Sequence, residues 1–223
     1  YENFLFKYIK KHSAYWNIED KTKRDDLKEY KYGKIEEIYT ESNDQVANTG
    51  INWFRSHGNN SSNRFSSLTQ INTSNAKNLK VAWTFKHDGF TDDIQANPIV
   101  VDGIIYTPVA GGYIAAIDGS SGKLLWKSQE FGYFVARRGL VYFKTEDGKH
   151  RLYFSNRERL ICLDANTGKT VKNFGKNGQV RTGLNVMTPV IYKNNIVIVT
   201  WDHAVEVYDS VSYTHLRAHE TGR

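Results

Sequence analysis

A turn motif that recurs along the chain constrains the fold more than any other feature of the sequence. Residues 116–126 read Ala-x-Asp-x-x-Ser-Gly-x-x-x-Trp, and residues 162–172 repeat this order with Cys first, Thr for Ser and Lys last. The aspartates of the two motifs, Asp118 and Asp164, lie 46 residues apart, and Asp209 follows 45 residues later. A period of roughly 40–45 residues with several short strands in each repeat is typical of the blades of a β-propeller.

Short apolar runs between turn residues predict the strands of these blades. We expect strands in the following segments: 98–107, 113–117 and a run ending at Trp126 in the first repeat; 139–143, 151–155 and 160–163 in the second; and further strands between Asn185 and Asp209 in the third. The run Val81–Phe85 predicts an edge strand of a blade whose other strands lie elsewhere, and residues 171–180, rich in Gly and Asn, predict a loop. The predicted fold class is all-β, a partial β-propeller of two to three blades.

The character of the sequence divides the chain into three parts. Residues 1–50 carry charges of both signs and indicate an N-terminal extension, whereas residues 51–209 hold the repeats of an incomplete β-propeller domain. The repeat pattern fails in residues 210–223, where VSYTHLRAHET resembles the translation of a sequencing-library adapter. We expect this segment to be a non-native tail whose two histidines are not a metal pair, with a natural basic tail as the alternative. The native protein would then continue further, and the chain would be a fragment.

Composition and charge exclude some classes of function. The net charge of +6 and the pI near 9.2 come from residues scattered along the chain rather than gathered in one stripe, which argues against a nucleic-acid partner. The single cysteine, Cys162, excludes an intrachain disulfide and occupies a motif position typical of a small buried residue. No apolar run reaches the ~18 residues of a membrane-spanning helix.

Local motifs alone identify no active site, so we predict no catalytic residue and no metal ligand. The recurring Asp118 and Asp164 are expected to accept hydrogen bonds within tight turns, and Trp126 is expected to pack between blades. The histidines of the repeat region stand alone in the sequence: His57, His87, His150 and His203.

Several segments, in matching order, resemble the opening part of the quinoprotein dehydrogenases that use pyrroloquinoline quinone (PQQ). Each segment alone is a weak signal, but together they extend over about residues 53–209. The segments are FSSLTQIN at 65–72, NLKVAWTF at 78–85, QANPIVVDG at 95–103, RRGLVY at 137–142, LDANTGK at 163–169 and FGKNG at 174–178.

The resemblance implies an eight-bladed propeller that binds PQQ and calcium and oxidises a sugar, polyol or alcohol hydroxyl by hydride transfer to the quinone. It also implies a periplasmic or periplasm-facing, membrane-associated protein that passes electrons to the quinone pool or to a cytochrome. A fragment of such an enzyme is expected to be inactive. The alternative is a non-catalytic propeller that serves as a scaffold in the bacterial envelope. The Arg138-Gly139 pair and residues 63–85 favour the enzyme, because a scaffold has no need of them.

Five residues are cofactor-binding candidates by this resemblance: Gln95, Arg138, Thr188, Trp201 and Asp202. Arg138 would hold the carboxylates of the quinone, since a planar guanidinium binds a carboxylate in bidentate fashion. Gln95 stands where methanol-type members have a glutamate near the quinone. Thr188 is the closest match to an expected hydroxyl, and Trp201 and Asp202 follow the strand after which a carboxylate is expected.

The chain also departs from the pattern of the family. Methanol-type members carry adjacent cysteines just before Arg-Gly, whereas residues 134–137 of this chain read Phe-Val-Ala-Arg. This difference favours a substrate of the glucose, polyol or quinate branch over methanol. The remaining calcium ligands and the catalytic base are expected beyond Asp209.

Overall fold

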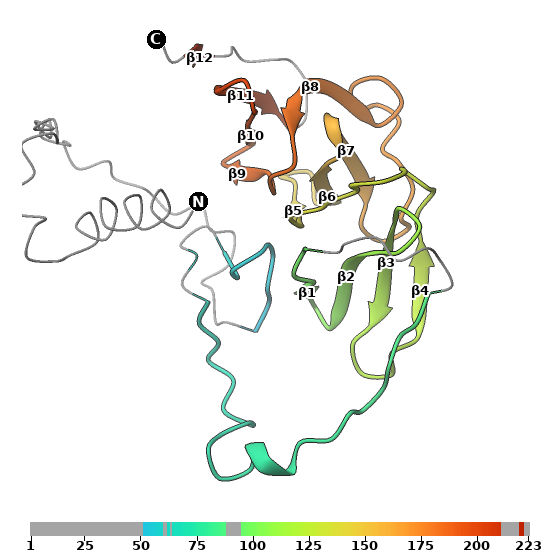
Figure 1. Cartoon of the computed structure of the whole chain (residues 1–223), viewed down its shortest axis with the longest axis vertical. Helices are drawn as coiled ribbons and strands as arrows, with labels where there is room; N and C mark the ends of the chain where they lie inside the picture. The colour runs from blue at the N-terminus through green and yellow to red at the C-terminus, as the bar shows by residue number, and fades with distance from the viewer. Residues whose placement is uncertain (1–50, 60–61, 63, 88–94, 211–218, 221–223) are drawn as a thin grey trace, which may run out of the picture. The chain divides into compact units, whose positions relative to one another are not determined.

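The structure, a computed structural model, describes residues 51–59, 62, 64–87 and 95–210 and the backbone of His219 and Glu220. Its strands form three antiparallel sheets, each with four strands in chain order (Figure 1). The first sheet holds β1 (Ile99–Val101), β2 (Ile104–Val109), β3 (Tyr113–Asp118) and β4 (Leu124–Lys127). The second holds β5 (Leu140–Lys144), β6 (His150–Ser155), β7 (Arg157–Asp164) and β8 (Gln179–Asn185). The third holds β9 (Val190–Tyr192), β10 (Asn195–Val199), β11 (Ala204–Asp209) and β12 (His219–Glu220). A single 3-10 turn, η2 (Ala76–Asn78), precedes these sheets in the described part of the chain.

The three sheets follow one another as neighbouring blades. β1 lies beside β5, and β5 lies beside β9, so the first strand of each sheet is its innermost strand. Residues 53–54 run along these inner strands. The Trp53 amide donates to the Val100 carbonyl at 2.6 Å, and the Tyr142 amide donates to the Phe54 carbonyl at 2.8 Å. These four-stranded meanders around adjacent inner strands confirm the predicted fold class, an all-β partial propeller.

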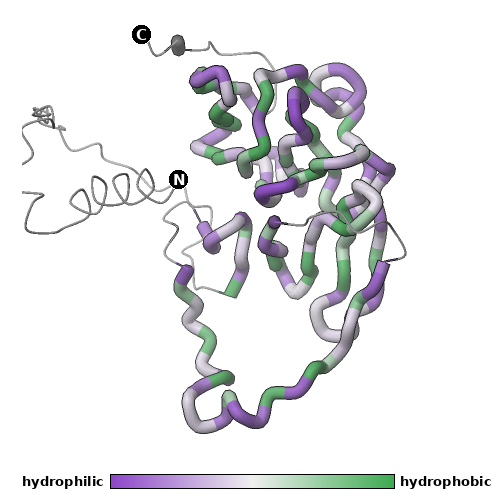
Figure 2. The backbone as a smooth tube through the Cα atoms, viewed as in Figure 1, coloured by the Kyte–Doolittle hydropathy of each residue, from purple (hydrophilic) through white to green (hydrophobic). Residues whose placement is uncertain are grey.

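Apolar cores fill the spaces between successive sheets. On β6 the consecutive side chains of Tyr153 and Phe154 are both fully buried, but they belong to different cores because neighbouring strand residues point to opposite faces. Phe154 packs in the core shared with the first sheet, and Tyr153 packs in the core shared with the third. Hydrophobic stretches run along the strands, and hydrophilic residues occupy many turns (Figure 2). The second sheet is therefore covered on both faces.

The predicted single strand at 98–107 is wrong, because this run contains two strands. Asp102 and Gly103 have φ values of 50° and 78°, and Val101 pairs directly with Ile104 across the turn they form. An Asp-Gly pair with positive φ at both residues is the usual two-residue hairpin connection. Asp102 and Gly103 interrupt the apolar run, so the sequence does mark this hairpin, and the prediction of one strand overlooked the signal.

The predicted loop at 171–180 is too long, because β8 begins at Gln179. Val180 pairs with Leu160 of β7, and the backbone ladder continues to Asn185 opposite Arg157. The sequence of β8, QVRTGLN, is mostly polar and lacks the alternation that marks a strand. The loop that precedes it is anchored by Phe174, which is fully buried.

The predicted strand at Val81–Phe85 is also wrong, because this segment joins no sheet in the described structure. Val81 is 82% exposed, whereas Trp83 and Phe85 pack against the outer face of the first sheet. The indole Nε1 of Trp83 donates to the Gly119 carbonyl at 3.1 Å. The segment is held in place by the side chains of Trp83 and Phe85. It forms no strand because no neighbouring strand in the described structure pairs with its backbone.

The expectations for residues 1–50 and for most of residues 210–223 fall outside the described ranges. Within the tail, the backbone of His219 and Glu220 forms β12, which pairs with Val205 and Ala204 of β11. The sequence does not predict β12. The interpretation of this segment as non-native stays a prediction. Among the described residues, no helix is long and apolar enough to cross a membrane.

Candidate functional site

All five cofactor-binding candidates lie at corresponding ends of the three sheets. Gln95, Arg138 and Thr188 precede β1, β5 and β9, and Trp201 and Asp202 form part of the turn between β10 and β11. In an antiparallel meander, the start of the first strand and the turn between the second and third lie at the same end of the sheet. We call this end, where the inner strands begin, the entry end.

The backbone at Arg138 is held by two hydroxyl groups from distant parts of the chain. Thr188 Oγ1 donates to the Arg138 carbonyl at 2.7 Å, and Ser56 Oγ donates to the same oxygen at 3.2 Å. A Cβ atom at Gly139, where φ is 124°, would lie 2.5 Å from Ser56 Oγ and 2.9 Å from Thr188 Oγ1. The glycine is therefore required for this close approach. The structure brings Arg138 and Thr188 together, and it adds Ser56, for which the sequence gives no signal.

The side chain of Arg138 is exposed at this fixed point. Within the described part of the chain, no hydrogen bond or ion pair engages its guanidinium. A guanidinium with fixed backbone support and no carboxylate partner is suited to bind the carboxylate of a ligand in bidentate fashion.

The turn that carries Trp201 and Asp202 is anchored to the end of β8. The Trp201 amide donates to the Leu184 carbonyl at 2.8 Å, while the indole is 66% exposed. A hydrogen bond from the Thr200 hydroxyl lowers the pKa of the Asp202 carboxyl. Among the described contacts, no hydrogen bond joins this turn to Arg138 or Thr188. The five candidates thus share one end of the fold, but only Arg138 and Thr188 are directly linked.

Gln95 is exposed and directly follows residues 88–94, which lie outside the described ranges. Its position before β1 agrees with a place at the entry end, and its role as a cofactor contact stays a prediction. No group of three His, Cys, Asp or Glu side chains within the described residues is arranged to hold a metal ion.

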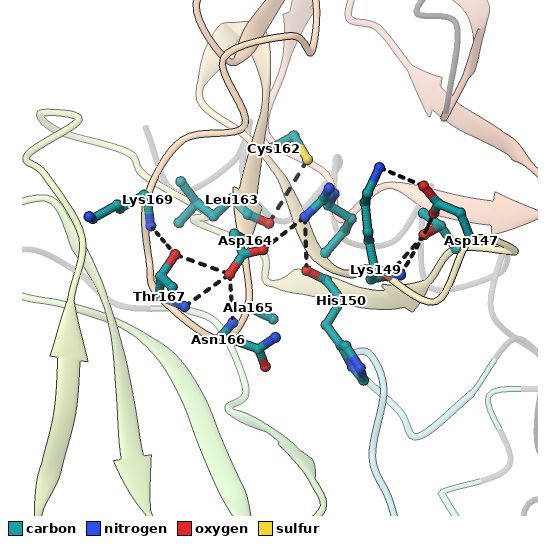
Figure 3. Close-up of polar contacts among 12 residues, drawn as sticks. Asp147, Lys149, His150, Cys162, Leu163, Asp164, Ala165, Asn166, Thr167 and Lys169 are labelled. Atoms are coloured by element: carbon teal, nitrogen blue, oxygen red, sulfur yellow. Dashed lines mark hydrogen bonds and ion pairs between the residues drawn. The ribbon is translucent and has the colours of Figure 1, made fainter.

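The turns of the repeat motif have the structural role that was predicted. Asp164 Oδ1 accepts hydrogen bonds from the Asn166 amide at 3.1 Å, the Thr167 amide at 3.1 Å and the Thr167 hydroxyl at 3.0 Å (Figure 3). Its Oδ2 accepts from Arg151 at 2.9 Å. Trp126 of the first sheet docks on this turn, with Nε1 donating to the Ala165 carbonyl at 3.0 Å. These contacts close the turn and tie the first blade to the second.

Cys162 is buried, as predicted for its motif position, and two of the isolated histidines take part in hydrogen bonds. Cys162 is 1% exposed, and burial raises the pKa of its thiol to about 12. His57 Nδ1 accepts a hydrogen bond from Arg64 Nε at 3.0 Å, and His150 Nδ1 is hydrogen-bonded to the Tyr142 hydroxyl. Neither histidine lies with other metal-ligating groups in the described structure.

Comparison with known proteins relates this geometry to one family. Residues 53–219 match the family described as "PQQ: Glucose/ethanol/alcohol dehydrogenase, beta-propeller domain". The chain is 37% identical over 123 residues to quinohemoprotein alcohol dehydrogenase ADH IIB of Pseudomonas putida, a match that covers 48% of this chain and 16% of that protein. It is 28% identical over 168 residues to methanol dehydrogenase (cytochrome c) subunit 1 of Methylobacterium organophilum, which covers 69% of this chain and 26% of that protein.

A solved structure shows the same fold. The crystal structure of quinohemoprotein alcohol dehydrogenase from Comamonas testosteroni superposes with a TM-score of 0.58 and 26% sequence identity. The match covers 75% of this chain and 27% of that one. The chain therefore spans about a sixth to a quarter of the length of these relatives.

Proposed function

Since the chain belongs to the family of PQQ-dependent glucose, ethanol and alcohol dehydrogenases through its β-propeller domain, we propose that the whole protein oxidises a hydroxyl group of a sugar, polyol or alcohol. The observation that carries the proposal is the arrangement at Arg138. Two hydroxyl groups fix its backbone, and its guanidinium is exposed at the entry end.

The residues at the entry end fit the quinone. PQQ carries several carboxylates on a planar ring system, and when bound it accepts a hydride from the carbon that bears the substrate hydroxyl. Arg138 would bind one of these carboxylates, and Thr188 would keep the backbone of Arg138 in position. Gln95 would add an uncharged donor and acceptor, and the exposed indole of Trp201 offers a flat apolar surface.

The described residues do not by themselves form a calcium site. Calcium takes roughly six to eight oxygen ligands, and Asp202 is the only carboxylate among the five candidates. A calcium ion in the whole protein would need most of its ligands from elsewhere, and we derive no step through it.

The partners and the location form a further part of the proposal. The Methylobacterium relative is named for cytochrome c, and this supports transfer of electrons to a cytochrome, with the quinone pool as the alternative acceptor. The family resemblance supports a periplasmic or periplasm-facing, membrane-associated protein. A non-catalytic envelope scaffold, the second candidate, would share the Asp-Thr-Gly turns but has no use for the supported Arg138.

Substitution of Arg138 in the full-length protein tests the proposal. Arg138→Gln should weaken PQQ binding about 10- to 100-fold, because the loss of a charge-assisted hydrogen bond costs roughly 1.5–3 kcal/mol. Arg138→Lys should restore part of the affinity. Arg159→Gln, which removes another exposed arginine on β7, is the matched control and should bind PQQ like the wild type. Titration calorimetry measures the affinity and PQQ-dependent dye reduction measures the activity. A full-length protein that binds no PQQ would refute the proposal.

A further inference from the structure

Four aromatic rings form a continuous row within the described structure. The ring centroids of Trp126 and Tyr106 lie 5.9 Å apart, and those of Tyr106 and Tyr142 lie 6.2 Å apart. His150 continues the row, since its ring centroid lies 5.8 Å from that of Tyr142. These separations are in the range of direct contact between aromatic rings. We call Trp126, Tyr106, Tyr142 and His150, which belong to four different strands of two sheets, the aromatic row.

The middle of the row is buried, and its two ends are partly exposed. Tyr106 is 3% exposed and Tyr142 is 8% exposed, and both belong to the core shared by the first and second sheets. Trp126, on the outermost strand of the first sheet, and His150, at the start of β6, are partly exposed. The row therefore leads from a partly exposed indole, through two buried phenols, to a partly exposed imidazole.

The Tyr142 hydroxyl has a proton acceptor within reach, because it is hydrogen-bonded to His150 Nδ1. Burial and the nearby charge of Asp102 raise the pKa of Tyr142 to about 12, so the phenol keeps its proton at neutral pH. A neutral phenol gives up an electron readily only if its proton leaves as well, because the oxidised phenol is a strong acid. The unprotonated nitrogen of a neutral imidazole can take that proton. Tyr142 is therefore arranged for the coupled loss of an electron and a proton.

Trp126 differs from Tyr142 in its hydrogen-bond partner. Its indole Nε1 donates to the Ala165 carbonyl at 3.0 Å, and a carbonyl oxygen is too weak a base to remove the proton. An oxidised Trp126 therefore stays a cation, which attracts an electron more strongly than a neutral radical does. Because Tyr142 can release its proton to His150, an electron should pass from Tyr142 to oxidised Trp126, with the ring of Tyr106 between them.

We propose that the aromatic row is a relay that passes oxidising equivalents from Trp126 to Tyr142 and protects the blade from one-electron oxidants. An oxidant such as the carbonate radical takes one electron from the indole and leaves as carbonate. One electron then moves from Tyr142 to Trp126 while the phenolic proton moves to His150 Nδ1, which leaves a neutral tyrosyl radical and an imidazolium. A small reductant such as ascorbate returns one electron along the row, and the proton goes back to the phenol oxygen. This function goes beyond the proposed alcohol oxidation and does not depend on it.

Peptide mapping by mass spectrometry tests the relay, because an oxidised indole that receives no electron takes up oxygen. After brief exposure of the full-length protein to carbonate radical, Trp126 should carry little added oxygen in the wild type. Tyr142→Phe, which keeps the ring but has no phenolic proton to release, should raise this yield several-fold. His150→Gln, which can still accept a hydrogen bond but is not a base, should have the same effect. Tyr153→Phe is the matched control, since Tyr153 is a fully buried tyrosine of the other core, and it should leave the yield unchanged.

Flash photolysis with a ruthenium(III) oxidant follows the two radicals directly. Tyrosyl absorption should grow as tryptophanyl absorption decays, and this transfer should be slower in heavy water because a proton moves with the electron. His150→Gln should slow the transfer about tenfold or more, as is usual when a positioned base is removed. The heavy-water comparison uses the wild-type protein, so it decides the question even if a variant fails to fold.

Three results would overturn the relay. The first is an equal oxygen yield at Trp126 in the wild type and in Tyr142→Phe, and the second is an equal increase in Tyr153→Phe. The third is a transfer rate that is the same in heavy and ordinary water. Failure of the protein to oxidise any alcohol would refute the proposed function, but it would leave these radical measurements and their outcome unaffected.

Discussion

Glycine residues in the repeat turns have a steric task in addition to a conformational one. A Cβ atom at Gly168 would lie 2.3 Å from Trp126 Cε3, and one at Gly122 would lie 2.5 Å from Trp83 Cδ2. Each glycine thus leaves room for a tryptophan from another segment to lie flat over its turn. Asp118 and Asp164 close the same turns with their carboxylates.

Substitution of one such glycine separates the steric effect from the backbone effect. Gly168→Ala should lower the free energy of unfolding by about 2 kcal/mol or more, because a methyl group must displace the Trp126 ring and accept a φ of 70°. Gly148→Ala is the control, since Gly148 has a φ of 77° and nothing lies within 4 Å of its added Cβ. Denaturant unfolding measures both values. Equal losses in the two variants would show that the tryptophan contact is unimportant.

The carboxylate of Asp118 should make stability depend on pH. Hydrogen bonds from Ser120 and then Ser121 lower the pKa of Asp118 to about 2. A lowered pKa means that this stabilisation is complete above about pH 4 and is lost as the pH falls towards 2. Asp118→Asn should therefore lower the melting temperature at pH 6, and its difference from wild type should shrink between pH 4 and pH 2. A difference independent of pH would contradict this assignment.

At the scale of the elements, the tryptophan that joins two sheets is the most informative contact. Trp126 belongs to β4 of the first sheet, and its indole Nε1 donates a hydrogen bond to the Ala165 carbonyl of the second sheet. Trp126→Phe keeps an aromatic ring but loses this bond, and it should cost about 1 kcal/mol. Trp126→Ala removes the ring as well and should cost about 3 kcal/mol. Unfolding free energies provide the test, and a smaller loss for Ala than for Phe would exclude docking between the sheets.

The sequence predicts those elements whose signal is local. β6, β7 and the turn that follows β7 at Asp164 can be predicted from apolar runs and a recurring Asp-x-x-Thr-Gly pattern. β8 escapes prediction because its polar residues are held by backbone pairing with β7. Val81–Phe85 is misread because a β-rich composition cannot show whether a partner strand is present.

The same distinction holds for the candidate site. Arg138 and Thr188 are candidates through a resemblance, and the fold places the Thr188 Oγ1 atom 2.7 Å from the Arg138 carbonyl oxygen. The Ser56 hydroxyl donates to the Arg138 carbonyl across a separation of 82 residues in the sequence. Such contacts arise only when distant segments pack together, so no spacing in the sequence reveals them.

At the scale of the whole molecule, the described sheets supply one side of a site and not a complete catalytic centre. The entry end offers a guanidinium, a hydroxyl, an exposed indole and the carboxylate of Asp202, but among the described residues no three metal-ligating side chains come together there. The chain also spans only 16–27% of its relatives. Alcohol oxidation in this family requires a positioned base to take the hydroxyl proton as the hydride leaves.

We therefore expect the 223-residue chain alone to reduce no dye when PQQ, calcium and an alcohol are added, whereas the full-length protein does. Arg138 still provides a carboxylate-binding group, so the chain is expected to retain weak PQQ binding, which Arg138→Gln should abolish. Dye reduction measures the activity, and quenching of tryptophan fluorescence measures binding. PQQ-dependent dye reduction by the chain alone would mean that its own residues complete the site, and the carboxylate of Asp202 would then be the first candidate for the base.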